Sequence, residues 1–105
     1  MFEITDPRFS ARMAAHIELS NQQAREASVD KVSLSMIDAS CRYNVWLWAV
    51  ASEDVEALKA VRAEALQALL QETARRFEKH FDQYVENYDP YILAHRRAAE
   101  QAQTS

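Results

Sequence analysis

The side chains best suited to catalysis or metal binding are few in this sequence, and their spacing suits neither task. The histidines, His16, His80 and His95, form no Glu-x-x-His pair and no pair four residues apart, the spacings of helical di-iron and zinc sites. The single cysteine, Cys41, falls on an apolar arc of its expected helix, where a buried thiol is inert. We therefore expect no catalytic residues, no metal site and no cofactor.

The charged residues disfavour two further functions, catalysis by paired carboxylates and binding to nucleic acid. Glu78, Asp82 and Glu86 form an acidic row with a spacing of four residues. A pair of catalytic carboxylates needs contrasting surroundings across a cleft, whereas a row on one ridge is typical of a solvated helix face. The net charge of −4 and the pI near 5.3 disfavour binding to nucleic-acid phosphates.

Asn44 is the polar residue that fits its surroundings least well. It projects into the broad apolar arc of its expected helix, and a buried amide is costly unless it is hydrogen-bonded. It belongs either to a structural network that fixes helix register or to a ligand pocket between helices. The candidate polar cluster contains Asn21, Arg42, Tyr43, Asn44 and Asn87.

The composition predicts a single all-α domain spanning residues 1–105. The chain has no glycine, two prolines and 49% hydrophobic residues, so glycine-rich phosphate loops are excluded. Its longest apolar run, residues 45–51, is far short of the roughly 20 residues needed to cross a bilayer. A lone cysteine is typical of a reducing compartment, and we expect a cytoplasmic protein.

Polar caps mark the start of the first two expected helices. Asp6 followed by Pro7 is an N-cap signature, and apolar residues at helical spacing extend the first helix to about residue 27. The second helix covers about residues 31–51 and is apolar over most of its circumference. Such a helix must be covered on more than one side, which makes it the candidate central helix.

A long third helix is predicted from Ser52 to Tyr88, with Ser52 as its cap. A break near Thr73 is the alternative. Asp89 and Pro90 end this helix, and residues 91–101 are a possible short fourth helix. Residues 102–105 are expected to be disordered.

The lengths of these helices predict that one surface remains uncovered. The third helix would be about 54 Å long and the first two about 32 Å each, so they cannot cover all of it. A strip of aromatic side chains does not face water without a reason. Either the C-terminal segment folds back over it, which would be a thin cover, or a second subunit covers it, and a two-fold homodimer is the favoured prediction. His80 lies on the same stripe, as an expected interior or interface residue. The candidate dimer surface contains Phe77, Phe81, Tyr84, Val85 and Tyr88.

Four runs of the sequence resemble a bacterial family of small, all-helical proteins with a domain of unknown function. These runs are residues 17–23, 32–35, 39–44 and 82–88. The family pattern contains isoleucine, two residues and Ala-Asn, then Ala-Ala-Arg-Phe-Asn, and finally Asp-Tyr-Ile-x-Asn-Phe. Ser20 and Cys41 stand where that pattern has alanine, and aromatic residues exchange at positions 43 and 88.

This resemblance covers about residues 9–91 and implies a compact bacterial helical domain. It marks Asn21, Arg42, Asn44 and Asn87 as matched polar positions, without assigning them a role. No activity follows from it.

Three functions remain open from the sequence. The favoured hypothesis is a non-catalytic helical homodimer that acts through protein–protein interaction, with an unidentified protein partner. The alternative is a small-molecule-binding bundle or an enzyme with a polar pocket around Asn44. A nucleic-acid-associated regulator is the second and least favoured alternative.

Overall fold

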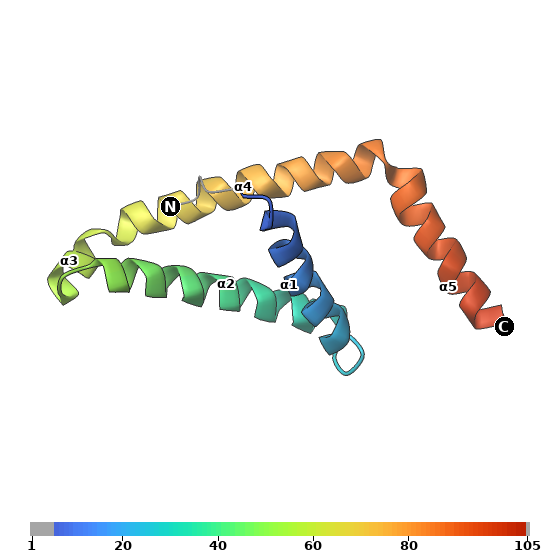
Figure 1. The fold of residues 1–105 in the computed structure, drawn as a ribbon, viewed down its shortest axis with the longest axis horizontal. Coiled ribbons are helices and arrows are strands. Elements are labelled where there is room, and N and C mark those ends of the chain that lie inside the picture. Colours follow the sequence, from blue (N-terminus) through green and yellow to red (C-terminus); the bar gives the residue numbers. More distant parts are fainter. Residues whose placement is uncertain (1–5, 105) are drawn as a thin grey trace. The chain divides into compact units, whose positions relative to one another are not determined.

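All regular secondary structure that the computed structural model describes, over residues 6–104, is helical (Figure 1). This confirms the predicted all-α class. The helices are α1 (Phe9–Gln23), α2 (Val29–Ala51), α3 (Val55–Ala60), α4 (Arg62–Glu86), the π-helical turn η1 (Asp89–Leu93) and α5 (Ala94–Thr104). No helix within the described range has both the length and the apolar character needed to cross a membrane.

The chain divides into two units, Met1–Leu66 and Gln67–Ser105, with the boundary inside α4. The first unit contains α1, α2, α3 and the first residues of α4. In it, α1 contacts α2 across the loop that joins them (Figure 1). The second unit contains the rest of α4, η1 and α5.

α1 and α2 start close to the expected places, and α2 has a side-chain cap. Asp6 Oδ1 accepts a hydrogen bond from the Arg8 amide at 2.8 Å, and Asp6 Oδ2 pairs with Arg12 Nη2 at 2.7 Å. The hydrogen bond from Arg12 lowers the pKa of Asp6. Ser28 Oγ accepts from the Lys31 amide at 3.4 Å. The predicted N-cap at Asp6 is not found: α1 begins at Phe9, two residues after Pro7, with Arg8 at its N-cap.

The cap of the next helix lies two residues later than the sequence predicted. Ser52 does not cap α3, because its hydroxyl donates to the Trp48 carbonyl oxygen in the last turn of α2 at 2.8 Å. Asp54 is the cap, and its Oδ1 accepts from the Ala57 amide at 2.8 Å. Serine and aspartate are both favoured N-cap residues. The hydroxyl of Ser52 is already used in the last turn of α2, so Asp54 caps α3.

The prediction of one unbroken helix from Ser52 to Tyr88 is wrong at its N-terminal end. α3 and α4 are separated at Val61, whose amide donates to the Leu58 carbonyl oxygen at 3.3 Å, a tight three-residue turn. Helical bonding resumes when the Ala65 amide donates to Val61 at 2.8 Å. The chain continues as helix through Thr73, so the alternative break is absent there.

This break reduces the length mismatch on which the predicted dimer rests, although α1, with 15 residues, stays shorter than α4. α4 has 25 residues and α2 has 23, which correspond to about 38 and 35 Å. A difference of one turn or less leaves no half-helix exposed by length alone. A second copy must therefore be inferred from the exposure of side chains and not from the length of the helix.

A bend follows α4 where proline removes a backbone donor (Figure 1). Pro90 has no N–H to donate to the Glu86 carbonyl oxygen four residues earlier, which ends the regular α4 pattern. Backbone bonding continues around it, since the Asn87 amide donates to Gln83 and the Tyr91 amide donates to Asn87, both at 3.0 Å. The π-helical turn η1 joins the two helices at this point.

The predicted fourth helix is present as α5, and it extends past the expected end near residue 101. Residues 102–104, which we expected in a disordered tail, are helical. Ser105 lies outside the described residues.

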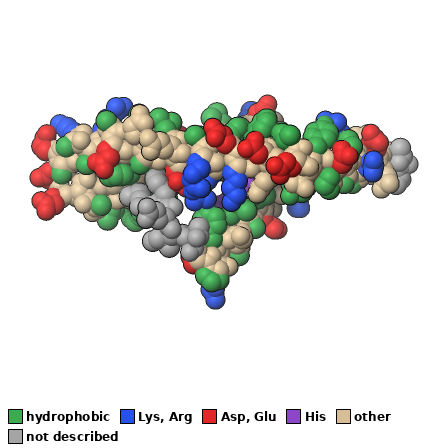
Figure 2. Space-filling view, turned by 90° about the horizontal axis from the view of Figure 1, so that it is seen from above, with side chains coloured by type: hydrophobic (Ala, Val, Ile, Leu, Met, Phe, Trp, Pro, Cys, Tyr) green, Lys and Arg blue, Asp and Glu red, His purple; other side chains and the backbone are tan. Residues whose placement is uncertain are grey.

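Very little of the chain is buried. Among the side chains that the structure describes, Val32 is the buried hydrophobic one, with 6% of its surface exposed. On α2, Leu34, Ile37, Val45 and Val50 are each more than half exposed, so the expected cover on several sides of this helix is not found. Figure 2 shows hydrophobic side chains at the surface among the charged ones.

Replacing the α3 cap tests the local assignment. Asp54→Ala should destabilise the protein by about 1 kcal/mol, because the Ala57 amide loses its side-chain acceptor. Thermal unfolding followed by circular dichroism measures this change. The neighbouring Glu53→Ala is the matched control, and equal effects of the two variants would contradict the assignment.

Candidate interaction surface

One face of α4 in the second unit carries a row of exposed hydrophobic side chains. Its residues alternate in steps of four and three, the spacing that keeps side chains on one side of a helix. We call this face the aromatic seam, and it consists of Leu70, Ala74, Phe77, Phe81, Tyr84 and Tyr88. It contains four of the five residues of the predicted dimer surface, while Val85 lies on its flank.

The side chains of the seam are exposed in the chain alone. The exposed fractions are 53% for Leu70, 66% for Phe77, 59% for Phe81, 50% for Tyr84 and 43% for Tyr88. Val85 on the flank is 64% exposed, and Ala74 is exposed as well. The sequence predicted the chemical character of this surface but omitted Leu70 and Ala74 from it, although their spacing continues the same pattern.

Aromatic rings of the seam contact neighbouring rings, but their side chains stay exposed to solvent. The Phe77 and Phe81 ring centroids are 5.9 Å apart. Past the bend, Tyr91 meets Tyr84 edge to face with ring centroids 4.9 Å apart. These contacts restrict the rings before any partner arrives, which lowers the entropy lost on association.

The contact with α5 marks the C-terminal end of the seam. The Arg96 guanidinium lies over the Tyr88 ring, 5.9 Å from its centroid. Tyr88 is also the least exposed of the four aromatic residues. The open part of the surface therefore lies toward Leu70.

Charges lie off the seam on the rest of α4. Glu72 is half-buried and binds the guanidinium groups of both Arg75 and Arg76, the latter at 2.7 Å from Nε to Oε1. The hydrogen bond from Arg75 is the main reason that the pKa of Glu72 lies below its usual value, and Arg76 acts in the same direction. The acidic row is exposed, as expected of a solvated face.

The candidate polar residues are divided between the two units. Asn21 is on α1, and Arg42, Tyr43 and Asn44 are on α2, all in the first unit. Asn87 follows α4 in the second unit, where its Nδ2 donates to the Gln83 carbonyl oxygen at 2.9 Å. The amide of Asn87 is thus satisfied locally. Whether the five residues act together stays a prediction.

Asn44 itself has an unusual environment. Its Nδ2 makes a long hydrogen bond of 3.5 Å to the Ser40 carbonyl oxygen, while its Oδ1 is buried and has no hydrogen-bond partner. Next to it on α2, Tyr43 is exposed and lies against Trp46 with ring centroids 5.8 Å apart. Asn44 Oδ1 therefore lacks the hydrogen-bond partner that the sequence predicted for this amide.

Two further expectations about α2 and α4 are corrected. Cys41 is exposed, although its apolar arc predicted a buried thiol. His80 is exposed as well, so it is not an interior residue of the single chain. Within residues 6–104, no group of three or more His, Cys, Asp or Glu side chains is placed to hold a metal ion.

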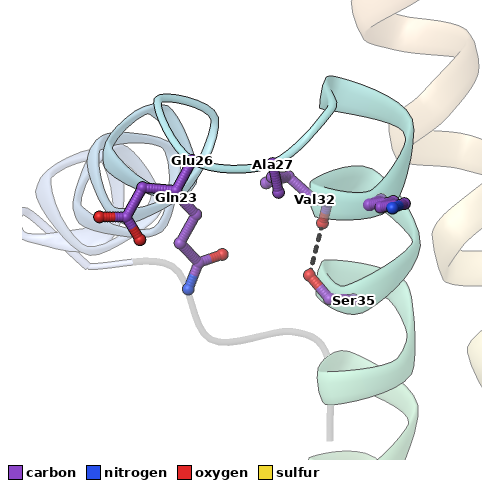
Figure 3. A pocket seen from close by; sticks show the side chains of 6 residues that line it. Gln23, Glu26, Ala27, Val32 and Ser35 are labelled. Atoms are coloured by element: carbon purple, nitrogen blue, oxygen red, sulfur yellow. Dashed lines mark hydrogen bonds between the residues drawn. The ribbon is translucent and has the colours of Figure 1, made fainter.

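A shallow surface pocket lies where α1, its following loop and the start of α2 meet (Figure 3). The Ser35 hydroxyl in this pocket donates to the Val32 carbonyl oxygen at 2.8 Å and is therefore already used within the helix. None of the five candidate polar residues lines it. The lining residues are Gln23, Glu26, Ala27, Lys31, Val32 and Ser35.

These features define a small helical protein with an exposed aromatic helix face. The chain belongs to DUF3144, a family described as a protein of unknown function, whose pattern matches residues 9–85. The match begins at the first residue of α1 and ends just before the last residue of α4. It includes Asn21, Arg42 and Asn44, while Asn87 lies beyond it. No curated protein and no solved structure matches the chain.

The pairing of Glu72 with two arginines predicts a pH effect on α4. A carboxylate whose pKa is lower in the folded chain adds stability above its unfolded pKa, and this stability is lost as the pH falls through the folded pKa. Circular dichroism should therefore show helix loss below about pH 4.5, the usual pKa of this side chain, and Glu72→Gln should lack that component. Asp82→Asn should keep the wild-type profile. Identical profiles for all three proteins would contradict the role of Glu72.

Proposed function

We propose that this protein is a non-catalytic helical homodimer that acts through protein–protein interaction, and that the aromatic seam is the surface on which two copies meet. Exposure of the seam is the observation that carries this proposal. A stable small domain covers most of its large apolar side chains, whereas this chain leaves a row of them open to solvent.

The second unit supports the need for a partner. Over residues 67–103 no side chain is buried, even though α4 presents a continuous apolar face there. Units of about 40 residues or fewer rarely form a sufficient core alone, and oligomerisation is one common solution. Two-fold symmetry is the commonest way for identical chains to meet.

The area available on the seam fits a modest dimer interface. A fully exposed aromatic side chain offers on the order of 200 Å². At the exposures given above, the seam offers about 500 Å² in each copy, so two copies would bury about 1,000 Å². That value reaches the lower bound of specific interfaces, and Val85 adds area at the edge.

The working compartment in this proposal is the reducing cytoplasm of a bacterium. A single exposed thiol, Cys41, supports it, because a lone accessible cysteine in an oxidising environment is open to unwanted disulfides.

Light scattering on the full-length protein tests the proposal. At tens of micromolar we expect twice the chain mass of 12.1 kDa. Phe81→Glu should weaken the dimer on the order of a hundredfold, because it places a charge in the centre of the seam. The matched control Gln83→Glu lies off the seam on the same helix and should remain dimeric. A monomeric wild-type protein would overturn the proposal.

The unpartnered Asn44 oxygen favours one second candidate, a small-molecule-binding bundle with its polar contact at this amide. A buried acceptor without a donor costs about 1–3 kcal/mol, and a ligand that supplies the donor would recover it. The pocket described above does not include Asn44, so this candidate ranks below the dimer.

Substitution of Asn44 separates the two candidates. If no ligand or internal donor satisfies Oδ1, Asn44→Leu should leave the thermal midpoint unchanged or raise it, by a gain of up to about 1 kcal/mol. Differential scanning calorimetry of protein purified from its native cytoplasm measures this. A loss of stability of about 2 kcal/mol or more would show that the amide is satisfied in solution and would favour the ligand-binding bundle.

A further inference from the structure

We propose that the two copies pair along the aromatic seam in antiparallel orientation, about a two-fold axis that crosses α4 at the level of Lys79. This inference rests on the homodimer proposed above and specifies its geometry. It follows from how the sizes of the seam residues are distributed along the helix.

The seam is symmetric in position about residue 79. In an antiparallel pair centred there, Phe77 lies opposite the partner's Phe81, and Ala74 lies opposite the partner's Tyr84. Leu70 then lies opposite the partner's Tyr88. Each of the six seam positions thus meets another seam position of the partner, and Tyr88 at the end of the seam also keeps the Arg96 guanidinium over its ring.

The side chains differ in size between the two ends of the seam. This difference favours the antiparallel orientation of the pair. Its small end contains Ala74 and its large end contains Tyr84 and Tyr88. A parallel pair would place Ala74 against its own copy and Tyr84 against its own copy, which gives a void in one layer and crowding in another. An antiparallel pair matches small with large in the outer layers, so the helix axes keep one separation of about 8–10 Å along the seam.

The residues beside the seam provide a second, independent difference between the two orientations. Glu78 lies next to the proposed axis on the same flank as Val85, so the antiparallel pair brings the two Glu78 carboxylates near each other. Like charges across an interface weaken it. In the parallel alternative, Glu78 would lie beside the partner's Thr73 and meet no like charge.

The orientation is tested with spin labels on the back of α4, away from the seam. Lys79→Cys and Glu86→Cys are labelled separately in the full-length chain carrying Cys41→Ser, and the distance between the two labels of each dimer is measured by pulsed electron resonance. The two sites are seven residues apart and face the same way. In the antiparallel dimer the axial separation of the labels is near zero at position 79 and about 21 Å at position 86.

Each outcome of this experiment decides the orientation or the dimer. A clearly longer label distance at position 86 than at position 79 supports the antiparallel pair. Equal distances at the two positions show a parallel pair and overturn this inference, while the proposed homodimer stands. Absence of dipolar coupling at both positions, together with a monomer in light scattering, overturns the homodimer itself.

Glu78→Gln provides a second readout that does not depend on labels. Sedimentation equilibrium should show a dimer about three- to fivefold tighter than wild type, because the repulsion at the axis is removed. Asp82→Asn, which removes a charge farther from the seam, is the matched control with little expected effect. A weaker or unchanged dimer for Glu78→Gln would contradict the antiparallel axis.

Discussion

Apolar surface that the chain's own helices leave uncovered is the constraint on which the rest of this structure depends. Side chains cap α2 and α3, yet Val32 is the buried hydrophobic residue among the described side chains. Isolated helices of ordinary length are marginal in water, and most helical stability in proteins comes from the packing of an apolar face. A helix such as α4, with its aromatic residues half exposed or more along one side, is therefore stable as a complete structure when another surface covers that side.

The aromatic seam combines two properties that suit a partner of the same kind. Its alternating steps of four and three residues present one straight strip, with aliphatic Leu70 and Ala74 at one end and Tyr84 and Tyr88 at the other. Two such strips are complementary when they run in opposite directions. The bend at Pro90 limits the strip at one end, since Tyr91 and Arg96 contact its last tyrosines from beyond the bend. Membership of the DUF3144 family assigns no activity, so the chemistry of this face is the main guide to function.

Much of the fold was predictable because local signals agreed with one another. The cap at Ser28 and the second proline at position 90 each mark a helix boundary, and the proline after Asp6 lies two residues before one. The apolar period along α4 predicted a row of aromatic residues on one face, and these residues are exposed in the single chain. The break at Val61 was not predictable, because neither glycine, proline nor a capping residue occupies that position.

The candidate polar site was less predictable, for a different reason. A helical wheel shows which side chains share an arc, but not whether another helix covers that arc. Cys41 was expected to be buried on this basis and is exposed. Asn44 was expected to have a hydrogen-bond network, and its oxygen has no partner. The predicted length of the third helix was wrong because the chain breaks at Val61, whereas the exposure of the seam does not depend on that length.

The central claim is that folding of α4 and association of two copies are coupled. The most direct measurement is the thermal unfolding midpoint over a hundredfold range of protein concentration, followed by circular dichroism. If the second copy covers the seam, dilution favours the unfolded monomer by mass action, and the midpoint should fall steadily as the protein is diluted. A midpoint that is independent of concentration, with full helix content at the lowest concentration, would show that one chain satisfies its own apolar surface and would contradict the account.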